Sequence, residues 1–438
     1  MNSLKPRLTF ISPVFLFPND AGGKIRTTNI LRGLKGGAFH VTLLSPMAHA
    51  QMDRWSKEIE GVCDEFISWE PAAAAPKWRR ALDLLGVLPV NVAADRTKSG
   101  LAAVHQLFER GEIDLVVFDF VHSAVLRPET MRCKSICFTH NVEAEIFARH
   151  ASQASGPLWR WLWRSQHSKM LSFERTALRA FDSVIAVSER DARHFKDGYG
   201  IGASYPIPTG VDLNFFAYDD PSTPAPSTPP TVVFTGSMDW AANIDGVQFF
   251  LAKVWPRVLA QRPDARFIVV GRNPPTDLVA RSRALANVEF TGFVDDVRTY
   301  VHQAHAFVIP LLVGGGTRIK AFEAMAMGCP VVSTAIGIEG LGADRDVHYL
   351  ERDEPAAFAD AVLTLLSDGV LRTGLARRAR QLVEERFGHE KVARVFEDIC
   401  LRTLATSEPV KQPNVKRLAG EPKSERLSPV ARAIKSGS

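Results

Sequence analysis

Residues 306–334 read AFVIPLLVGGGTRIKAFEAMAMGCPVVST, and this stretch combines two short apolar runs, three consecutive glycines and a helical pattern. The apolar runs at 306–309 and 330–333 are rich in β-branched residues, and the helical pattern between them opens near Thr317. Continuous apolar strands joined through helices are typical of parallel sheets that helices cover on both faces. The stretch therefore predicts a strand–helix–strand unit of an α/β domain.

The same alternation of short strands and helices continues in both directions along the chain. In the second half, further strands are expected at 231–235, 266–270, 288–291 and near 347–350. In the first half, strands are expected at 7–12, 40–44, 65–68, 114–118, 135–138, 182–187 and 204–207. Two such series predict an α/β protein of two doubly wound, Rossmann-like domains that face a cleft, where ligands meet the carboxyl ends of the strands.

A proline-rich segment separates the two series. Residues 219–231, DDPSTPAPSTPPT, hold five prolines and no large apolar side chain, which predicts a stiff extended linker. The expected units are an N-terminal domain at 1–218, the linker at 219–231, a C-terminal domain at 232–404 and a tail at 405–438. Three helical patterns near the end of the chain have no strands between them, so they either pack outside the second sheet or cross back onto the first domain: 355–368, 371–386 and 389–404.

The composition is that of a soluble globular protein, with 46% hydrophobic and 23% charged residues in a chain of 438. The formal net charge is +5, but residues 405–438 hold seven Lys/Arg against three Asp/Glu and so contribute +4 of it. A nearly neutral folded body argues against a nucleic-acid-binding protein. The basic tail predicts disorder; it is either attracted to an anionic surface or a solvated segment without a role.

Cysteine usage and hydropathy predict where the protein works. The five cysteines are scattered, and Cys133 and Cys137 form a single C-x3-C without a second pair at zinc spacing. No apolar run approaches the roughly 20 residues of a membrane-spanning helix. These features predict a reducing, cytoplasmic location.

One helical segment offers a peripheral contact with the inner face of a membrane. The stretch PLWRWLWRSQHSKM (157–170) holds three tryptophans within five residues, with Arg160 and Arg164 between and beside them. On a helix, Trp159, Leu162, Trp163 and Gln166 share one face while the two arginines lie on another. The pattern fits an interfacial membrane helix and equally an amphipathic helix docked on the first domain.

The glycine-rich turn at Gly314, Gly315 and Gly316 is the strongest candidate for a ligand site. Glycines allow close approach to the backbone, and the helix that opens at Thr317 offers free N–H groups to a phosphate. Arg318 and Lys320 lie in the first helical turn, where cations oppose the helix dipole and suit an anionic ligand. Glu323 follows three residues after Lys320, where a carboxylate can accept hydrogen bonds from ribose hydroxyls. The alternative is an ordinary glycine loop with surface charges.

The first domain offers a weaker set of candidates at corresponding strand ends. Gly22 and Gly23 precede a helical pattern, so the turn through Arg26 can bind a diphosphate or the acceptor, or be a simple helix entry. His140 follows the strand that ends at Phe138, at an edge where a histidine can bond a substrate hydroxyl or act as acid or base. The alternative is a structural His140 beside a helix-capping Asn141. Asp119 lies at a similar level and is a weaker candidate.

No metal site is expected. The triplet at 344–346 has the D-x-D form that can hold a divalent ion on a sugar nucleotide, but it lies in a turn-rich stretch without a third ligand. We therefore expect a solvated loop there and neither a metal nor a bound cofactor.

Taken together, these residues resemble retaining glycosyltransferases of the GT-B fold, specifically glycosyltransferase family 4. In the second domain the resemblance is carried by FTGSMDWAANIDGVQFF (234–250), VVG (269–271), FTGFVDDV (290–297), GGGTRIKAFEAMAMGCPVVST (314–334) and GIEGL (337–341). In the first domain it is patchier and rests on AGGKIRTTNILRGL, FTHNVEAE, SVIAVSERDA (183–192) and IPTGVDLNFF (207–216).

The resemblance implies roles for the candidate residues. Glu323 corresponds to the second acid of the family's E-x7-E motif, which binds the donor ribose, while Gly315 stands where the first acid is expected. The family's diphosphate-binding Arg and Lys after the strand 231–235 are absent, so Arg318 and Lys320 would carry the diphosphate charge. The implied donor-binding set is Gly236, Gly314, Gly315, Gly316, Thr317, Arg318, Lys320 and Glu323, with His140, Arg318 and Lys320 as the catalytic residues.

The resemblance also implies the reaction. A sugar would move from a nucleotide-diphosphate sugar, which serves as co-substrate without metal, to a glycan or lipid-linked acceptor bound near Gly22, Gly23 and Arg26, in polysaccharide or glycoconjugate synthesis. Two alternatives remain at this level. A sugar-nucleotide epimerase of the same architecture would isomerise the donor alone, and a non-catalytic regulator would bind nucleotide without turnover.

Overall fold

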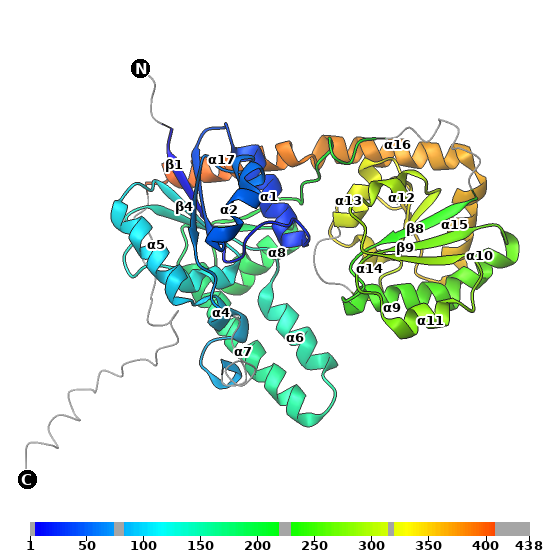
Figure 1. Ribbon diagram of the computed structural model, residues 1–438, viewed down its shortest axis with the longest axis horizontal. Coiled ribbons are helices and arrows are strands. Elements are labelled where there is room, and N and C mark those ends of the chain that lie inside the picture. Colours follow the sequence, from blue (N-terminus) through cyan, green and yellow to red (C-terminus); the bar gives the residue numbers. More distant parts are fainter. Residues whose placement is uncertain (1–4, 74–82, 219–228, 314–318, 408–438) are drawn as a thin grey trace, which may run out of the picture.

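The computed structural model describes residues 5–73, 83–218, 229–313 and 319–407. Within them the chain forms two α/β domains, each with its own parallel sheet, and Figure 1 shows the two domains side by side. The predicted pair of doubly wound domains is confirmed. The predicted domain limits stay predictions, because the linker and the tail lie largely outside the described residues.

The first domain is built on a seven-stranded sheet in the order β3-β2-β1-β4-β5-β6-β7. Every pairing in it is parallel. Its strands are β1 (Arg7–Ile11), β2 (His40–Pro46), β3 (Glu65–Trp69), β4 (Leu115–Asp119), β5 (Lys134–Phe138), β6 (Ser183–Ala186) and β7 (Ser204–Pro206). Its helices are α1 (Gly22–Leu34), η1 (His49–Gln51), α2 (Met52–Glu60), α4 (Val90–Asp95), α5 (Lys98–Arg110), η2 (Val121–Leu126), α6 (Glu143–Gln153), α7 (Pro157–Arg179), α8 (Glu189–Arg193) and the π-helical turn η3 (His194–Gly198).

The second domain has six parallel strands in the order β10-β9-β8-β11-β12-β13. They are β8 (Thr231–Thr235), β9 (Arg266–Val270), β10 (Val288–Gly292), β11 (Ala306–Ile309), β12 (Val331–Ser333) and β13 (Leu350–Glu351). Its helices are α9 (Ala241–Phe249), η4 (Phe250–Val254), α10 (Trp255–Gln261), α11 (Thr276–Ser282), α12 (Arg298–His302), α13 (Ile319–Ala326), α14 (Ala335–Ile338), α15 (Pro355–Ser367) and α16 (Gly369–Arg386). The predicted strands 231–235, 266–270 and 306–309 have these bounds, and the others differ by one or two residues, apart from the last.

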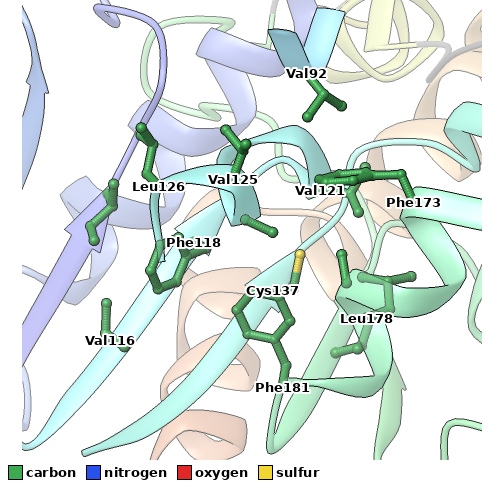
Figure 2. Close-up of a cluster of buried hydrophobic side chains, with 14 of the residues drawn as sticks. Val92, Val116, Phe118, Val121, Val125, Leu126, Cys137, Phe173, Leu178 and Phe181 are labelled. Atoms are coloured by element: carbon green, nitrogen blue, oxygen red, sulfur yellow. The ribbon is translucent and has the colours of Figure 1, made fainter. Parts of the chain in front are cut away.

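Helices cover both faces of each sheet, as the continuous apolar strands predict. In β4, Val116 and Phe118 pack into one core cluster while Leu115 and Val117 pack into the other. Figure 2 shows the first of these clusters, where side chains of β4 and η2 meet Phe173 and Leu178 of α7. Both faces of the strand are therefore buried in the core, so a ligand can reach β4 only at an end of the strand.

The last helix, α17 (His389–Ala405), crosses back onto the first domain. Its Val392, Phe396 and Cys400 belong to the same core cluster as Phe10 of β1. The contact with α1 is close because Gly33 is a glycine: a Cβ at Gly33 would lie 2.2 Å from the Cβ of Ala393. Figure 1 shows α16 and α17 running along one side of both domains, so the chain end ties the second domain to the first.

Candidate active site between the domains

A cavity of about 580 Å³ lies between the two domains. From the first domain it is lined by the loop before α6, by α6 itself and by the start of α8, including His140, Glu145 and Arg190. From the second domain it is lined mainly by apolar side chains such as Leu312, Ile336 and Leu341. The cavity thus lies where two doubly wound domains are expected to bind a ligand.

The first domain closes its side of the cleft with a buried polar network at the carboxyl ends of the central strands. The His140 Nε2 atom lies 2.7 Å from Asp119 Oδ1 at the end of β4, and Arg26 Nη1 of α1 lies 2.8 Å from His140 Nδ1. The Thr27 and Ser12 hydroxyls also donate to Asp119, each at 3.0 Å from Oδ2. The network therefore joins α1 to strands β1 and β4 and to the loop after β5.

The hydrogen bonds determine which nitrogen of His140 carries the proton. A guanidinium can only donate, so His140 Nδ1 accepts from Arg26 and Nε2–H donates to the Asp119 carboxylate. Burial lowers the pKa of His140, although the Asp119 carboxylate opposes this effect. The ring is therefore neutral, and both of its nitrogens are engaged inside the domain.

Arg26 is part of this network rather than of the cavity wall. It is only 2% exposed, and its Nε and Nη2 atoms lie 3.3 and 3.2 Å from Thr209 Oγ1. Burial lowers the pKa of Arg26 to about 10, with Asp119 acting against the shift. The predicted contact of Arg26 with a diphosphate or acceptor stays a prediction. In the structure, the buried positive charge of Arg26 lies next to His140 and is stabilised by the charge of Asp119.

Gly23 lets the start of α1 press against the same network. A Cβ at Gly23 would lie 2.7 Å from Cζ of Phe120, whose ring stacks on His140 with centroids 3.9 Å apart. Gly22 faces the second domain instead, because a Cβ there would lie 3.4 Å from Cδ1 of Ile319 in α13. The glycine pair thus brings the start of α1 next to the start of α13 across the cleft.

The second domain brings Gly236 and Lys320 together at its own strand edge. Lys320 Nζ lies 2.9 Å from Asn243 Oδ1 and 4.2 Å from the ring centroid of Phe234. A Cβ at Gly236, directly after β8, would lie 2.6 Å from Lys320 Nζ. A side chain at 236 would therefore collide with the amine, so the glycine at 236 makes room for Lys320 Nζ and the Asn243 amide.

Glu323 lies one turn after Lys320 on the same helix, and it is half-buried. Burial raises the pKa of Glu323 to about 7, and the Lys320 charge only partly opposes this shift. A carboxylate near its titration point gains from a ligand hydroxyl that donates to its charged form. The predicted ribose contact of Glu323 stays a prediction.

Arg272 is a cation of this edge that the sequence analysis did not single out. It follows β9, and its Nε atom donates to Ser237 Oγ at 3.0 Å while it pairs with Asp239 at 3.7 Å and with Asp20 of the first domain at 3.4 Å. The sequence does contain a feature that could have identified Arg272: it comes directly after the VVG of 269–271, at a predicted strand end.

Part of the predicted donor loop lies outside the described residues. This applies to Gly314, Gly315, Gly316, Thr317 and Arg318, whose predicted roles stay predictions. Among the described predicted residues, the structure groups His140 with Arg26 and Gly23, and groups Lys320 with Gly236 and Glu323. In the part of the chain that is described, no group of three or more His, Cys, Asp or Glu could hold a metal ion.

The tryptophan-rich segment begins helix α7, which forms a hairpin with α6. Trp163 docks inside the hairpin, with its ring 4.7 Å from that of His150, and Gln166 is fully buried. Trp159 and Trp161 remain 57% and 59% exposed, and Leu158 is 71% exposed. Figure 1 shows this hairpin extending beyond the body of the first domain. Across the described chain, no helix is both long enough and apolar enough to cross a bilayer.

Comparison with known proteins supports the same assignment for both domains. A family model described as Glycosyltransferase Family 4 matches residues 22–215, and one described as Glycosyl transferases group 1 matches residues 229–368. A 44.6 kDa protein of the cps region of Klebsiella pneumoniae, itself uncharacterised, is 21% identical over 387 residues, which cover 86% of this chain and 95% of that protein.

Two further similarities carry functional names. A phosphatidyl-myo-inositol mannosyltransferase of Mycolicibacterium smegmatis is 32% identical over 204 residues, 45% of this chain, and the chain spans 52% of that relative. The structure of HepE from Anabaena in complex with UDP superposes with a TM-score of 0.63 at 15% identity, covering 90% of this chain and 98% of that one. At this identity the structural similarity establishes the shared fold.

Proposed function

This chain belongs to the glycosyltransferases of family 4, and from that premise we propose that it transfers a sugar from a nucleotide-diphosphate sugar to a lipid-linked or glycan acceptor. Transfer with retention at the anomeric carbon is the outcome that the family resemblance implies. The comparisons give no support to an epimerase or to a non-catalytic regulator.

One observation carries the donor half of this proposal: a lysine, a glycine that makes room for its amine, and a carboxylate with a raised pKa lie at the strand edge of the second domain. Lys320 lies against Asn243 and Phe234, with its amine in the space that the glycine at 236 leaves, and a diphosphate would bind at this amine. Glu323 is one turn further along α13, at a spacing that suits a ribose. The UDP bound to the structurally similar HepE supports a nucleoside diphosphate as the ligand.

Each residue then has a defined task. Lys320 and the start of α13 stabilise the negative charge that develops on the leaving diphosphate, as preorganised cations and N–H groups do in other transfer reactions. Glu323 holds the ribose. A contact from His140 to the donor sugar costs it one of its bonds to Arg26 or Asp119, because both ring nitrogens are engaged.

The acceptor half of the proposal includes a peripheral membrane contact through the tip of the α6–α7 hairpin. Leu158, Trp159 and Trp161 are exposed there beside Arg160 and Arg164, and α7 has no acidic residue before Glu174. Exposed tryptophans flanked by arginines favour the interface of an anionic bilayer. The mannosyltransferase relative is named for phosphatidylinositol, a membrane lipid.

The donor site is tested by thermal unfolding with UDP, GDP and ADP in turn. A nucleotide at about 100 times its dissociation constant adds about 2.7 kcal/mol to stability. We expect a shift with one of the three nucleotides and its loss in Lys320→Ala and Glu323→Ala. The absence of any shift in a well-folded sample would count against the transferase proposal.

The membrane contact is tested by co-sedimentation with vesicles of phosphatidylcholine and phosphatidylglycerol. Replacing Trp159 and Trp161 by Ala should release the protein into the supernatant, whereas Val370→Ala, which alters an even more exposed apolar side chain on α16, should not. Deleting residues 405–438 alone and together with the tryptophan changes separates the contribution of the tail. Unchanged binding in the combined variant would refute the contact.

A further inference from the structure

The first turn of α6 has no capping side chain of its own. Its N-cap residue is Val142, whose side chain cannot accept a hydrogen bond, so the N–H groups of the first turn need another acceptor. Helix α7 supplies it: Glu174 Oε1 lies 2.8 Å from the Glu143 nitrogen, and Oε2 lies 3.2 Å from the Ala144 nitrogen. A carboxylate also suits the positive end of the helix dipole. Glu174 therefore caps α6 from a neighbouring helix.

Glu174 has a third partner outside α6. The Tyr199 hydroxyl donates to Glu174 Oε2 at 2.8 Å, and Tyr199 comes directly after η3, the π-helical turn that continues α8. The Glu174 side chain is fully buried, and Tyr199 is only 3% exposed. A buried carboxylate requires such donors. One carboxylate on α7 thus joins the start of α6 to the end of the segment that α8 and η3 form.

Both of the joined segments form the first-domain wall of the cavity. The loop from His140 to Val142, which leads into α6, lines the cavity together with Glu145, and so does Arg190 at the start of α8. On the exposed side, Arg190 Nη2 lies 2.6 Å from each oxygen of the Glu145 carboxylate and so connects α8 to α6. The contacts of Glu174 are the buried counterpart of this ion pair. They hold the backbone directly after the cavity-lining loop.

The strength of this cap depends on the charge of Glu174. Glu174 faces ionisable groups on three elements: Glu143 on α6, Tyr199 after η3 and Cys137 on β5. Burial raises the pKa of Glu174 to about 7, although its three hydrogen bonds oppose the shift. The ionised carboxylate accepts from all three donors, whereas a protonated oxygen becomes a donor itself and gives up an acceptor position. The ionised form is therefore the better cap.

We infer that Glu174 is a positioning residue for sugar transfer: its carboxylate keeps the cavity wall of α6 and α8 in the geometry that holds the donor sugar, and Tyr199 orients that carboxylate. This inference rests on the proposed function and adds to it a residue that does not touch the substrate. In the proposed function the nucleotide binds to the second domain, so nucleotide affinity should not depend on Glu174, whereas nucleotide-sugar affinity should.

The test measures two affinities of the full chain by isothermal titration calorimetry, one for a nucleoside diphosphate and one for its sugar. The probe pairs are UDP with UDP-glucose and GDP with GDP-mannose. Glu174→Gln should weaken nucleotide-sugar binding about tenfold and leave nucleotide binding unchanged, because an amide has one acceptor oxygen in place of two. Ser183→Ala, which removes a buried hydroxyl contact between β6 and α17, controls for general destabilisation of the first domain.

The pH dependence separates positioning from a purely structural role. In the wild type, the ratio of nucleotide-sugar to nucleotide affinity should fall as the pH drops below about 7, where Glu174 gains a proton, and it should stay flat in Glu174→Gln. The ratio cancels the contribution of Glu323, which both ligands share. Tyr199→Phe removes a donor to the carboxylate, so the pKa of Glu174 rises further and the fall moves to higher pH. Tyr349→Phe, which removes a similar bond to Glu351 in the second domain, should not move it.

Three outcomes would overturn the inference: an unchanged affinity ratio in Glu174→Gln, a wild-type ratio that does not vary with pH, or a fall that Tyr199→Phe leaves at the same pH. Each of them leaves the proposed function intact as long as the wild type binds nucleotide. A well-folded wild type that binds no nucleotide contradicts the proposed function and the inference with it. Because Tyr199→Phe keeps the carboxylate, it tests the inference even where Glu174→Gln fails to fold.

Discussion

The two domains have sheets of the same topology, yet the charged side chains at their strand ends differ in burial. In the first domain, Asp119, His140 and Arg26 are at most 4% exposed and bond to one another. In the second domain, Lys320 and Glu323 are half-buried, and the Arg272 side chain is 40% exposed. The first edge holds its charges in a buried network, while the second leaves them partly exposed, as the proposed donor site requires. The difference teaches that position at a strand edge does not by itself make a residue a ligand contact.

The largest expected effect comes from breaking the closed network of the first domain. Replacing Asp119 by Ala removes the acceptor of His140 Nε2–H and the negative charge that most stabilises the buried Arg26 guanidinium, and losing the counter-charge of a buried ion costs about 3–5 kcal/mol. Urea unfolding measures the change. Adding Arg26→Met to Asp119→Ala should restore part of the stability, because both charges then disappear. Strictly additive losses would contradict the pairing.

The second prediction concerns the open edge of the second domain. Lys320→Ala should reduce nucleotide affinity roughly 100-fold, about 2.7 kcal/mol, while leaving the unfolding free energy nearly unchanged. Isothermal titration calorimetry measures the affinity. Lys253→Ala on η4 provides an exposed lysine of the same domain as control. Equal affinity in the wild type and Lys320→Ala would remove Lys320 from the donor site.

The third prediction compares one titrating carboxylate in each domain. Burial raises the pKa of both Glu323 and Glu174 to about 7, so each binds a proton more tightly in the folded state than in the unfolded state. Stability should therefore fall as pH rises from about 4.5 to about 7, by about 3 kcal/mol for each group. Glu323→Gln and Glu174→Gln should each reduce the fall of the unfolding free energy with pH, as measured by urea unfolding at a series of pH values.

Nucleotide distinguishes the two carboxylates. Glu174 accepts bonds from the backbone of Glu143 and Ala144 at the start of α6, away from the donor edge, so its contribution should not change with ligand. Glu323 should ionise more readily when a ribose donates to it, so nucleotide affinity should rise with pH towards about 7 and stay flat in Glu323→Gln. A pH dependence unaltered in that variant would exclude the ribose contact.

The smallest expected effect is at Arg272, which joins the two edges through Asp20. The pair is exposed and 3.4 Å long, so Arg272→Gln should change stability by less than about 1 kcal/mol. A modest loss of nucleotide affinity, roughly threefold, is expected from the missing charge. A loss as large as that of Lys320→Ala would make Arg272 the main diphosphate contact instead.

The sequence predicted the strands well because both faces of each strand are buried, and such strands are read from continuous apolar runs such as TVVFT at 231–235. It also predicted that Lys320 and Glu323 share one helix face, since their spacing is local. The Arg26–His140–Asp119 network could not be predicted, because it joins residues as far as 114 positions apart. Periodicity shows where strands end but not which side chains pair there. The return of α17 to the first domain was left open for the same reason.

Hydrogen exchange with and without the nucleotide that stabilises the protein tests the contrast between the two edges most directly. The account predicts slower exchange in the segments at 236–243 and 319–326, with no change in the already buried network segments at 115–119 and 134–140. Protection confined to the first domain, with the second-domain segments unchanged, would contradict the assignment of the donor site.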